Sequence, residues 1–157
     1  MPSIIAILNH KGGVGKTTTT INLAAALQQK GKKILVIDLD GQANLTESFG
    51  RSIEEPNTIY GAMKGEYPLP LIKTESGITL IPSCLDLSAA ESELINEPGR
   101  EMILKQLIGK LPKENKFDYI LIDCPPLIGI AYLKRIDGSR LPDYTGASSI
   151  LGNARYG

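Results

Sequence analysis

The residues best suited to chemistry form a glycine-rich segment near the start of the chain. It consists, in order, of Lys11, Gly12, Gly13, Val14, Gly15, Lys16, Thr17 and Thr18. Its glycines allow the backbone to turn successive N–H groups towards the oxygens of a bound phosphate. Lys16 supplies a positive charge for β- and γ-phosphates, and the Thr17 hydroxyl is suited to ligate Mg²⁺ directly. The segment therefore predicts a phosphate-binding loop for a nucleoside triphosphate.

The residues on either side of this loop predict the elements that position it. The apolar run Ile4 to Leu8 precedes the loop, and apolar residues recur at helical spacing from Thr18 until Gly31. A strand, the loop and a helix thus follow one another, so the helix dipole and its unpaired N–H groups face the same phosphates. A second apolar run, Ile34 to Ile37, completes a βαβ unit with a right-handed crossover.

Carboxylates follow two of the predicted strands. Asp38 and Asp40 come at the end of the second strand, and Asp123 ends a later apolar run, Phe117 to Asp123, in a Walker B pattern. In open α/β sheets, ligands lie beyond the carboxyl ends of the strands, so these carboxylates should approach the same phosphates. Because Mg²⁺ keeps several of its waters, we expect Asp38 and Asp123 to hold the ion through water.

The loop departs from the common pattern G-x-x-x-x-G-K-[ST], because His10 stands in place of the first glycine. The resulting K-G-G-x-G-K-T-T resembles the deviant Walker A box of the ParA, Soj and MinD family of ATPases. The segment Asp38 to Asn44 is similar to the family's D-x-D-P-Q-G-N, with Gly41 replacing the proline and Ala43 the glycine. The alternative, a glycine-rich turn with two solvated lysines, does not account for eight constrained positions between a strand and a helix.

The resemblance implies roles for two further residues. By position, Asp40 matches the family's carboxylate needed for hydrolysis, and Lys11 matches a lysine that crosses to the ATP of the other subunit. With Lys16, they are the candidate catalytic residues of a slow ATPase that uses Mg²⁺ and forms a homodimer on binding ATP. The resemblance also implies plasmid or chromosome partition as the setting, with a ParB-like activating protein and non-specific DNA as candidate partners.

Two other functions stay open at this level. A hydrolysis-deficient nucleotide-binding or regulatory fragment of such an ATPase would keep the loop without completing the cycle. A reductase of the same fold, with an iron–sulfur cluster bridging a dimer, would need well-placed cysteines. Cys84 and Cys124 give this second alternative poor support.

Composition and charge restrict the class of protein. Among 157 residues, 17 are basic and 17 are acidic, so nothing global points to nucleic acid or to an acidic membrane surface. The sequence shows neither a run of eighteen apolar residues nor a cleavable signal pattern, which predicts a cytoplasmic protein without a membrane segment. Two cysteines without C-x-x-C spacing fit a reducing compartment.

The predicted fold is an α/β P-loop NTPase domain over residues 1–129, with a parallel sheet flanked by helices on both faces. Strands are expected at Ile4 to Leu8, Ile34 to Ile37, Gly77 to Pro82 and Phe117 to Asp123. Further helices are expected at Leu45 to Phe49, Ile59 to Met63, Leu87 to Asn96 and Arg100 to Leu111. Residues 130–157 lack apolar periodicity, so we expect a domain truncated after the Walker B strand, followed by a divergent tail. The sheet should then have four strands, with Ile4 to Leu8 as an exposed or loosely covered edge.

Overall fold

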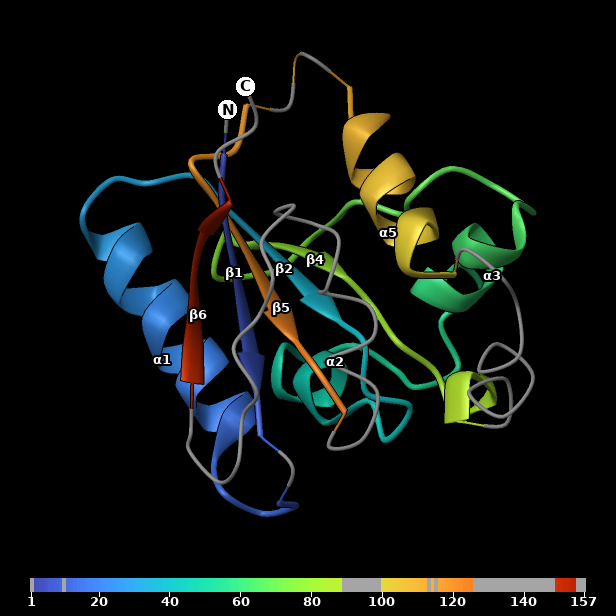
Figure 1. The fold of residues 1–157 in the computed structure, drawn as a ribbon, viewed down its shortest axis with the longest axis horizontal. Helices are drawn as coiled ribbons and strands as arrows, with labels where there is room; N and C mark the ends of the chain where they lie inside the picture. The colour runs from blue at the N-terminus through green and yellow to red at the C-terminus, as the bar shows by residue number, and fades with distance from the viewer. Residues whose placement is uncertain are drawn as a thin grey trace.

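A computed structural model describes residues 2–9, 11–88, 100–112, 114, 116–125 and 149–154. Figure 1 shows one sheet with helices on both of its faces. Its strands are β1 (Ser3–Leu8), β2 (Ile34–Asp38), β3 (Ile72–Lys73), β4 (Thr79–Ile81), β5 (Tyr119–Asp123) and β6 (Ser149–Ala154). The helices include α1 (Lys16–Gln29), α2 (Asn44–Ser48), α3 (Ile59–Lys64) and α5 (Arg100–Gly109). Residues 86–88 are also helical, and the rest of the helix expected up to Asn96 lies outside the described residues.

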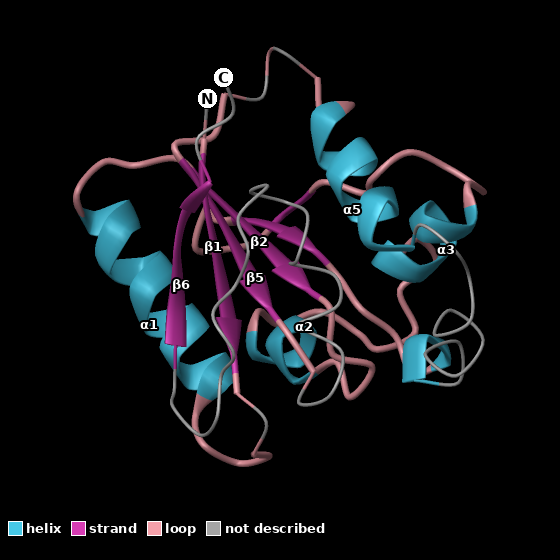
Figure 2. Cartoon of the chain, in the orientation of Figure 1, coloured by secondary structure: helices cyan, strands magenta, loops and turns pink. Residues whose placement is uncertain are grey.

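The strand order is β3-β4-β2-β5-β1-β6, and the strands fan out with the usual twist (Figure 2). Strands β4, β2, β5 and β1 are parallel to one another. In their ladders, Asp123 lies opposite both Asp38 of β2 and Ile7 of β1. The carboxyl ends of β1, β2 and β5 therefore meet at one side of the sheet, which we call the carboxyl edge.

Two apolar layers enclose the parallel strands. One layer contains Leu35, Ile37, Ile120 and Ile122 from the strands, Ile59 and Met63 from α3, and Leu104 and Ile108 from α5. The other contains Ile7, Val36, Leu80 and Leu121 from the strands, Ala24 from α1 and Leu45 from α2. Because helices cover both faces, the strands are continuous apolar runs, which confirms the fold class predicted from the sequence.

The helix expected at Arg100 to Leu111 is confirmed. Leu104 is fully buried and Ile108 is nearly so. Ile103, Leu107 and Leu111 are partly buried and pack against the same apolar layer. One face of this helix therefore lies against that layer. No helix in the described part of the chain is long and apolar enough to cross a membrane.

The four-stranded sheet expected from the sequence is wrong, because β3 and β6 add a strand at each side. Strand β6 pairs antiparallel with β1, with a register shift between Ile4 and Ala6. Strand β1 is therefore an inner strand, and Ile4 is 4% exposed. An apolar strand with unpaired N–H and C=O groups readily takes up another extended segment, and an antiparallel partner needs no helical crossover. Part of the expected tail, Ser149–Ala154, thus belongs to the sheet; the proposed boundary at residue 129 lies outside the described residues.

Candidate functional site

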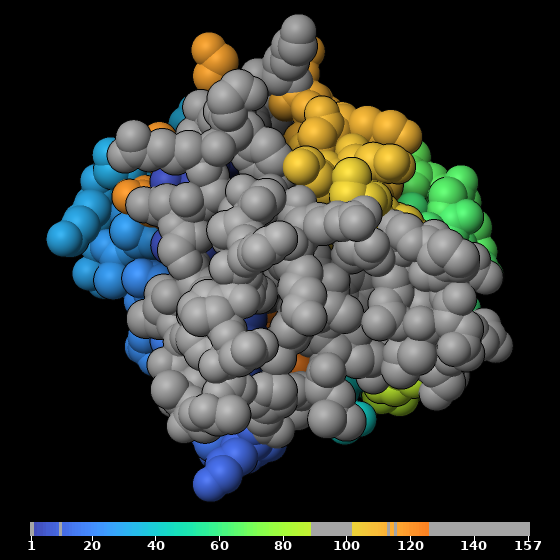
Figure 3. All heavy atoms as spheres, viewed as in Figure 1, coloured from blue at the N-terminus to red at the C-terminus, as the bar shows by residue number. Residues whose placement is uncertain are grey.

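The glycine-rich loop joins β1 to α1 at the carboxyl edge. Gly13 has φ 69° and Gly15 has φ 84°, values that suit glycine because an added Cβ is strained there. Gly15 precedes the first turn of α1, and no side chain caps that helix. Its first N–H groups can therefore receive an anion. The loop projects from the molecule in Figure 3, where its blue atoms stand out at the bottom, and Val14 is 46% exposed.

Thr17 and Asp123 connect the start of α1 to the end of β5. The Thr17 hydroxyl donates a hydrogen bond of 2.6 Å to Oδ2 of Asp123. Asp123 is only 1% exposed, and its other oxygen, Oδ1, has no hydrogen-bond partner among the described residues. An unpaired oxygen on a buried carboxylate costs free energy. A cation with its shell of water beside the Thr17 hydroxyl would remove that cost, so these residues fit Mg²⁺.

Asp38 is fully buried at the end of β2 and holds three hydrogen bonds. Its Oδ1 accepts the N–H of Asp40 at 3.1 Å. Its Oδ2 accepts both the N–H of Thr46 at 2.9 Å and the Thr46 hydroxyl at 2.7 Å. The same Thr46 hydroxyl accepts the N–H of Ser83 at 2.9 Å. Sequence reasoning gave Thr46 and Ser83 no role in the site, since only the folded chain brings them to Asp38.

The carboxyl groups of this edge influence one another's ionisation. Burial, together with the charge of Asp123, raises the pKa of Asp38 to about 7, although the hydrogen bonds from Thr46 act in the opposite direction. Burial also raises the pKa of Asp123 to about 6, where Thr17 and Lys16 oppose the effect and Asp40 adds to it. The ionised forms of both carboxylates are therefore poorly stabilised by the metal-free protein, and a divalent cation that balances their charge would bind favourably there.

The structure brings together most of the side chains that the sequence predicted for the site. Lys16, Thr17, Asp38, Asp40 and Asp123 act on one another through hydrogen bonds or charge at the carboxyl edge. Within the described part of the chain, no group of three or more His, Cys, Asp or Glu side chains could hold a metal ion alone. A cation here would thus depend on water and phosphate oxygens for much of its coordination, as Mg²⁺ usually does.

The remaining predicted residues lie in and around the loop. Gly12, Gly13 and Val14 are exposed, and Thr18 is exposed in the first turn of α1. Lys11 is also exposed, and its backbone N–H donates to Oδ1 of Asn9 at 3.0 Å.

The two departures from the family's D-x-D-P-Q-G-N pattern have different structural settings. A Cβ built on Gly41 would lie 2.6 Å from the backbone nitrogen of Ser88, so a proline ring has no room there. Ala43 has φ 55°, the left-handed conformation in which the family's glycine would be unstrained. The segment at 86–88 therefore accounts for Gly41, whereas Ala43 retains local strain.

The two cysteines do not suit an iron–sulfur cluster. Cys124 is fully buried, and burial raises the pKa of its thiol, whereas clusters are held by thiolates. Cys84 is partly buried, and its sulfur lies 3.4 Å from the Thr58 hydroxyl. These environments disfavour the reductase alternative.

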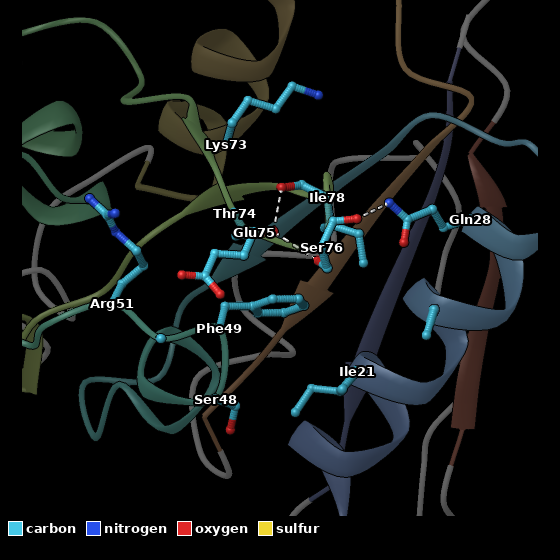
Figure 4. A pocket seen from close by; sticks show the side chains of 12 residues that line it. Ile21, Gln28, Ser48, Phe49, Arg51, Lys73, Thr74, Glu75, Ser76 and Ile78 are labelled. Atoms are coloured by element: carbon cyan, nitrogen blue, oxygen red, sulfur yellow. Dashed lines mark hydrogen bonds between the residues drawn. The ribbon is translucent and has the colours of Figure 1, made fainter.

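A groove of about 530 Å³ lies beside α1, and no residue of the phosphate loop lines it (Figure 4). Ile21 and Gln28 of α1 form one wall, and the ring of Phe49 points into the groove from the other side. Nε2 of Gln28 donates a hydrogen bond of 2.6 Å to the carbonyl oxygen of Ser76 in the β3–β4 turn. The hydroxyl of Thr74, in the same turn, donates to the carbonyl of Ile78 at 2.9 Å.

Known proteins resemble this chain over most of its length. Residues 2–137 match the family model described as an AAA domain. The chain is 42% identical over 139 residues to the chromosome partitioning protein ParA of Myxococcus xanthus, covering 85% of this chain and 48% of the relative. It is 38% identical over 143 residues to the sporulation initiation inhibitor protein Soj of Bacillus subtilis, covering 88% and 56%. The chain thus spans about half the length of the curated relatives it matches.

Solved structures show the same arrangement. A cobyrinic acid a,c-diamide synthase from Mycobacterium smegmatis with bound ATP analogue and magnesium has a TM-score of 0.76 and 38% identity, covering 83% of this chain and 54% of its own. A McdA variant from Cyanothece in complex with ATP has a TM-score of 0.74 and 33% identity, covering 87% and 54%. The parallel sheet, the loop before α1 and the strand-end carboxylates define a P-loop protein of the α/β class. With its family match and its relatives, the chain belongs to the ParA/Soj family of P-loop ATPases.

Proposed function

We propose that this chain binds ATP with Mg²⁺ at the carboxyl edge and hydrolyses it slowly, as a switch that dimerises when ATP is bound. The observation that carries the proposal is the Thr17–Asp123 hydrogen bond, beside which Oδ1 of buried Asp123 has no partner among the described residues. Solved relatives with an ATP analogue and magnesium, or with ATP, support the choice of ligand.

Each residue of the edge has a distinct task in this proposal. The loop N–H groups and Lys16 bind the phosphates. Thr17 would hold Mg²⁺ directly, and Asp38 and Asp123 would hold it through water. When bound, the ion neutralises negative charge on the phosphate oxygens.

Asp40 differs from the other two carboxylates of the edge because it is partly exposed. Its Oδ1 accepts the N–H of Gln42 at 3.0 Å, which fixes the direction of the carboxylate. A group that orients an attacking water must be both fixed and accessible to that water. Asp40 meets both requirements, and we assign it to this role.

Lys11 and the exposed loop support the dimerisation step. Lys11 precedes the glycines and is exposed, so it can reach beyond its own subunit. We assign it to the phosphates of a second copy, where its charge would stabilise the transition state as an arginine finger does. The names of the relatives favour plasmid or chromosome partition as the setting. A ParB-like protein and non-specific DNA are the partners that the family resemblance implies.

A hydrolysis-deficient nucleotide-binding or regulatory fragment is the second candidate. The chain spans about half the length of the relatives it matches, so the activity of those whole proteins does not by itself decide between the two functions. A nucleotide titration beside a phosphate-release assay separates the two functions. ATP binding with steady phosphate release supports the ATPase, binding without release supports the regulatory fragment, and absence of binding contradicts both.

The role of Asp40 is tested in the same pair of assays. Asp40→Ala should keep ATP affinity within about threefold, while turnover falls by at least roughly 100-fold, as expected on losing a group that acts on the attacking water. Undiminished turnover would mean that another residue orients the attacking water.

The dimer is tested by light scattering with a non-hydrolysable ATP analogue. The unmodified chain should dimerise only with the analogue, and Lys11→Ala should bind the analogue as a monomer. Lys30→Ala, which removes an exposed lysine just beyond the end of α1, is the matched control and should still dimerise. A dimer that forms without nucleotide would argue against the switch.

A further inference from the structure

Thr46 connects three segments that meet behind the carboxyl edge. It is fully buried in α2, and its hydroxyl donates to Oδ2 of Asp38 and accepts the N–H of Ser83. Its own N–H donates to the same Asp38 oxygen. Through one side chain, the end of β2, the start of α2 and the segment after β4 are held together.

We propose that Thr46 is a positioning residue that sets the Asp38 carboxylate for the water shell of Mg²⁺. The inference rests on the proposed function, because Asp38 can act in this way only if Mg²⁺ and a nucleotide bind at the carboxyl edge. Partners behind a metal-binding group commonly orient it, and their removal weakens metal binding by about 10–100-fold.

The hydrogen bonds of Asp38 show which of its oxygens Thr46 occupies. An ionised carboxylate offers about four lone-pair positions, two on each oxygen. Thr46 fills both positions of Oδ2 with its N–H and its hydroxyl. On Oδ1, the N–H of Asp40 fills one position. The remaining position of Oδ1 has no hydrogen-bond partner among the described residues, and we assign it to a water bound to the ion.

The first turn of α2 and the Asp38 carboxylate stabilise each other. Ala43 stands at the N-cap of this helix, and no side chain of the cap position receives a helix N–H. Asp38 takes that function from another segment by accepting the N–H of Thr46 in the first turn. The Asp38 carboxylate thus holds the first turn of α2 through the N–H of Thr46. The helix in turn places the Thr46 hydroxyl within hydrogen-bond distance of the carboxylate.

The experiment measures how Mg²⁺ changes the affinity for ADP, by calorimetric titration over a series of Mg²⁺ concentrations. Thr46→Val keeps the shape of the side chain but removes its hydroxyl. The Mg²⁺ concentration that gives half of the maximal change in ADP affinity should therefore rise about tenfold or more. Affinity for ADP in EDTA should stay unchanged. Thr46→Ser restores the hydroxyl and should behave as the unmodified chain does.

Thr74→Val is the matched control. Thr74 is also buried, and its hydroxyl bonds to the carbonyl of Ile78 in the β3–β4 turn. Its loss should lower the melting temperature without changing the Mg²⁺ dependence. If Thr46→Val only lowers the melting temperature in the same way, Thr46 is structural and the proposal is wrong. Should Thr46→Val not fold, Thr46→Cys retains a weak S–H donor and should give an intermediate shift.

A double-mutant cycle with Asp38→Asn tests whether Thr46 acts through Asp38. In the Asp38→Asn background, Thr46→Val should shift the Mg²⁺ dependence by less than twofold. A full tenfold shift in that background would overturn the proposal. If the unmodified chain itself shows no Mg²⁺-dependent binding of ADP, the proposed function fails; if it does and Thr46→Val matches it, this inference alone fails.

Discussion

The carboxyl edge and the groove beside α1 differ in how well their polar groups are satisfied. At the edge, buried Asp123 has an oxygen without a partner among the described residues, and burial raises the pKa of both Asp38 and Asp123. In the groove, Gln28 and Thr74 complete hydrogen bonds with neighbouring carbonyl groups (Figure 4). The groove is large enough to hold a ligand, but the buried carboxyl oxygen that lacks a partner lies at the edge. Unsatisfied buried charge, and not volume, therefore indicates where the chemistry lies.

The two regions also differ in how tightly they are packed. At the edge, the loop that carries Asp40 leaves no room for a Cβ on Gly41 because Ser88 lies against it. The groove, in contrast, is open between α1 and the β3–β4 turn. Larger side chains at Gly41 should thus lower stability, whereas substitutions in the groove should not affect ligand binding.

The largest expected difference follows from removing one lysine in each region. Lys16→Ala should weaken ATP binding by at least roughly 100-fold, because it removes the charge that pairs with the phosphates. Lys73→Ala, in the groove, should change the affinity by less than about twofold. Calorimetric titration measures both. Equal losses of ATP affinity in the two variants would contradict the proposed difference between the carboxyl edge and the groove.

Gly41→Pro restores the residue of the family pattern, yet it should destabilise this chain by about 1–3 kcal/mol because the ring would overlap Ser88. Gly109→Ala is the control, since nothing lies within 4 Å of an added Cβ at that exposed end of α5. Urea unfolding of both variants gives the comparison. A stable Gly41→Pro variant would mean that the contact with Ser88 is not maintained in solution.

The pH dependence of stability should reveal the buried carboxyl groups in the metal-free chain. Because the pKa values of Asp38 and Asp123 are raised to about 7 and about 6, the folded chain retains protons that the unfolded chain releases above about pH 4. Their contribution to stability is thus lost as the pH rises from about 4 to 7.

A double variant, Asp38→Asn with Asp123→Asn, isolates this contribution. The stability of the unmodified chain minus that of the variant should fall by on the order of 1 kcal/mol or more between pH 4.5 and 7.5 in EDTA. Denaturant unfolding at both pH values measures it. A difference that does not change with pH would show that the two carboxylates are well solvated, and one that grows with pH would show that the fold stabilises their ionised forms; either result contradicts the raised pKa values.

Ala43→Gly should give the smallest effect, and with the opposite sign to Gly41→Pro. Ala43 has φ 55°, so glycine would relieve left-handed strain and raise stability by about 0.5–1 kcal/mol. The same urea experiment measures the change. A loss of stability would show that packing of the buried Ala43 methyl group outweighs the strain.

The sequence predicts the central part of the fold and most of the candidate site because both depend on local patterns. The phosphate loop is contiguous, and Asp38 and Asp123 directly end apolar strands, so parallel pairing alone brings them to one edge. Gly31, where the helical pattern after the phosphate loop ends, has φ 73°. These features need no information about distant segments.

The parts that sequence reasoning missed depend on contacts between distant segments. Strand β6 pairs with β1 across the length of the chain, and its sequence includes Gly152 and Asn153, so its own residues gave little signal. The bond from Ser83 to Thr46 joins residues 37 positions apart. The contact of Gly41 with Ser88 likewise depends on how the segment after β4 returns to the edge. Long-range packing decides such features, and local propensity does not predict them.

Calorimetric titration of ADP with and without Mg²⁺, in the unmodified chain and in Asp123→Asn, tests the central claim most directly. The account predicts that Mg²⁺ raises the affinity of the unmodified chain by at least roughly tenfold, because the ion joins the phosphates to Thr17 and the carboxylates. Asp123→Asn should keep the Mg²⁺-free affinity and lose most of that gain. An affinity that does not respond to Mg²⁺, or a gain that survives intact in Asp123→Asn, would contradict a Mg²⁺–nucleotide site at the carboxyl edge.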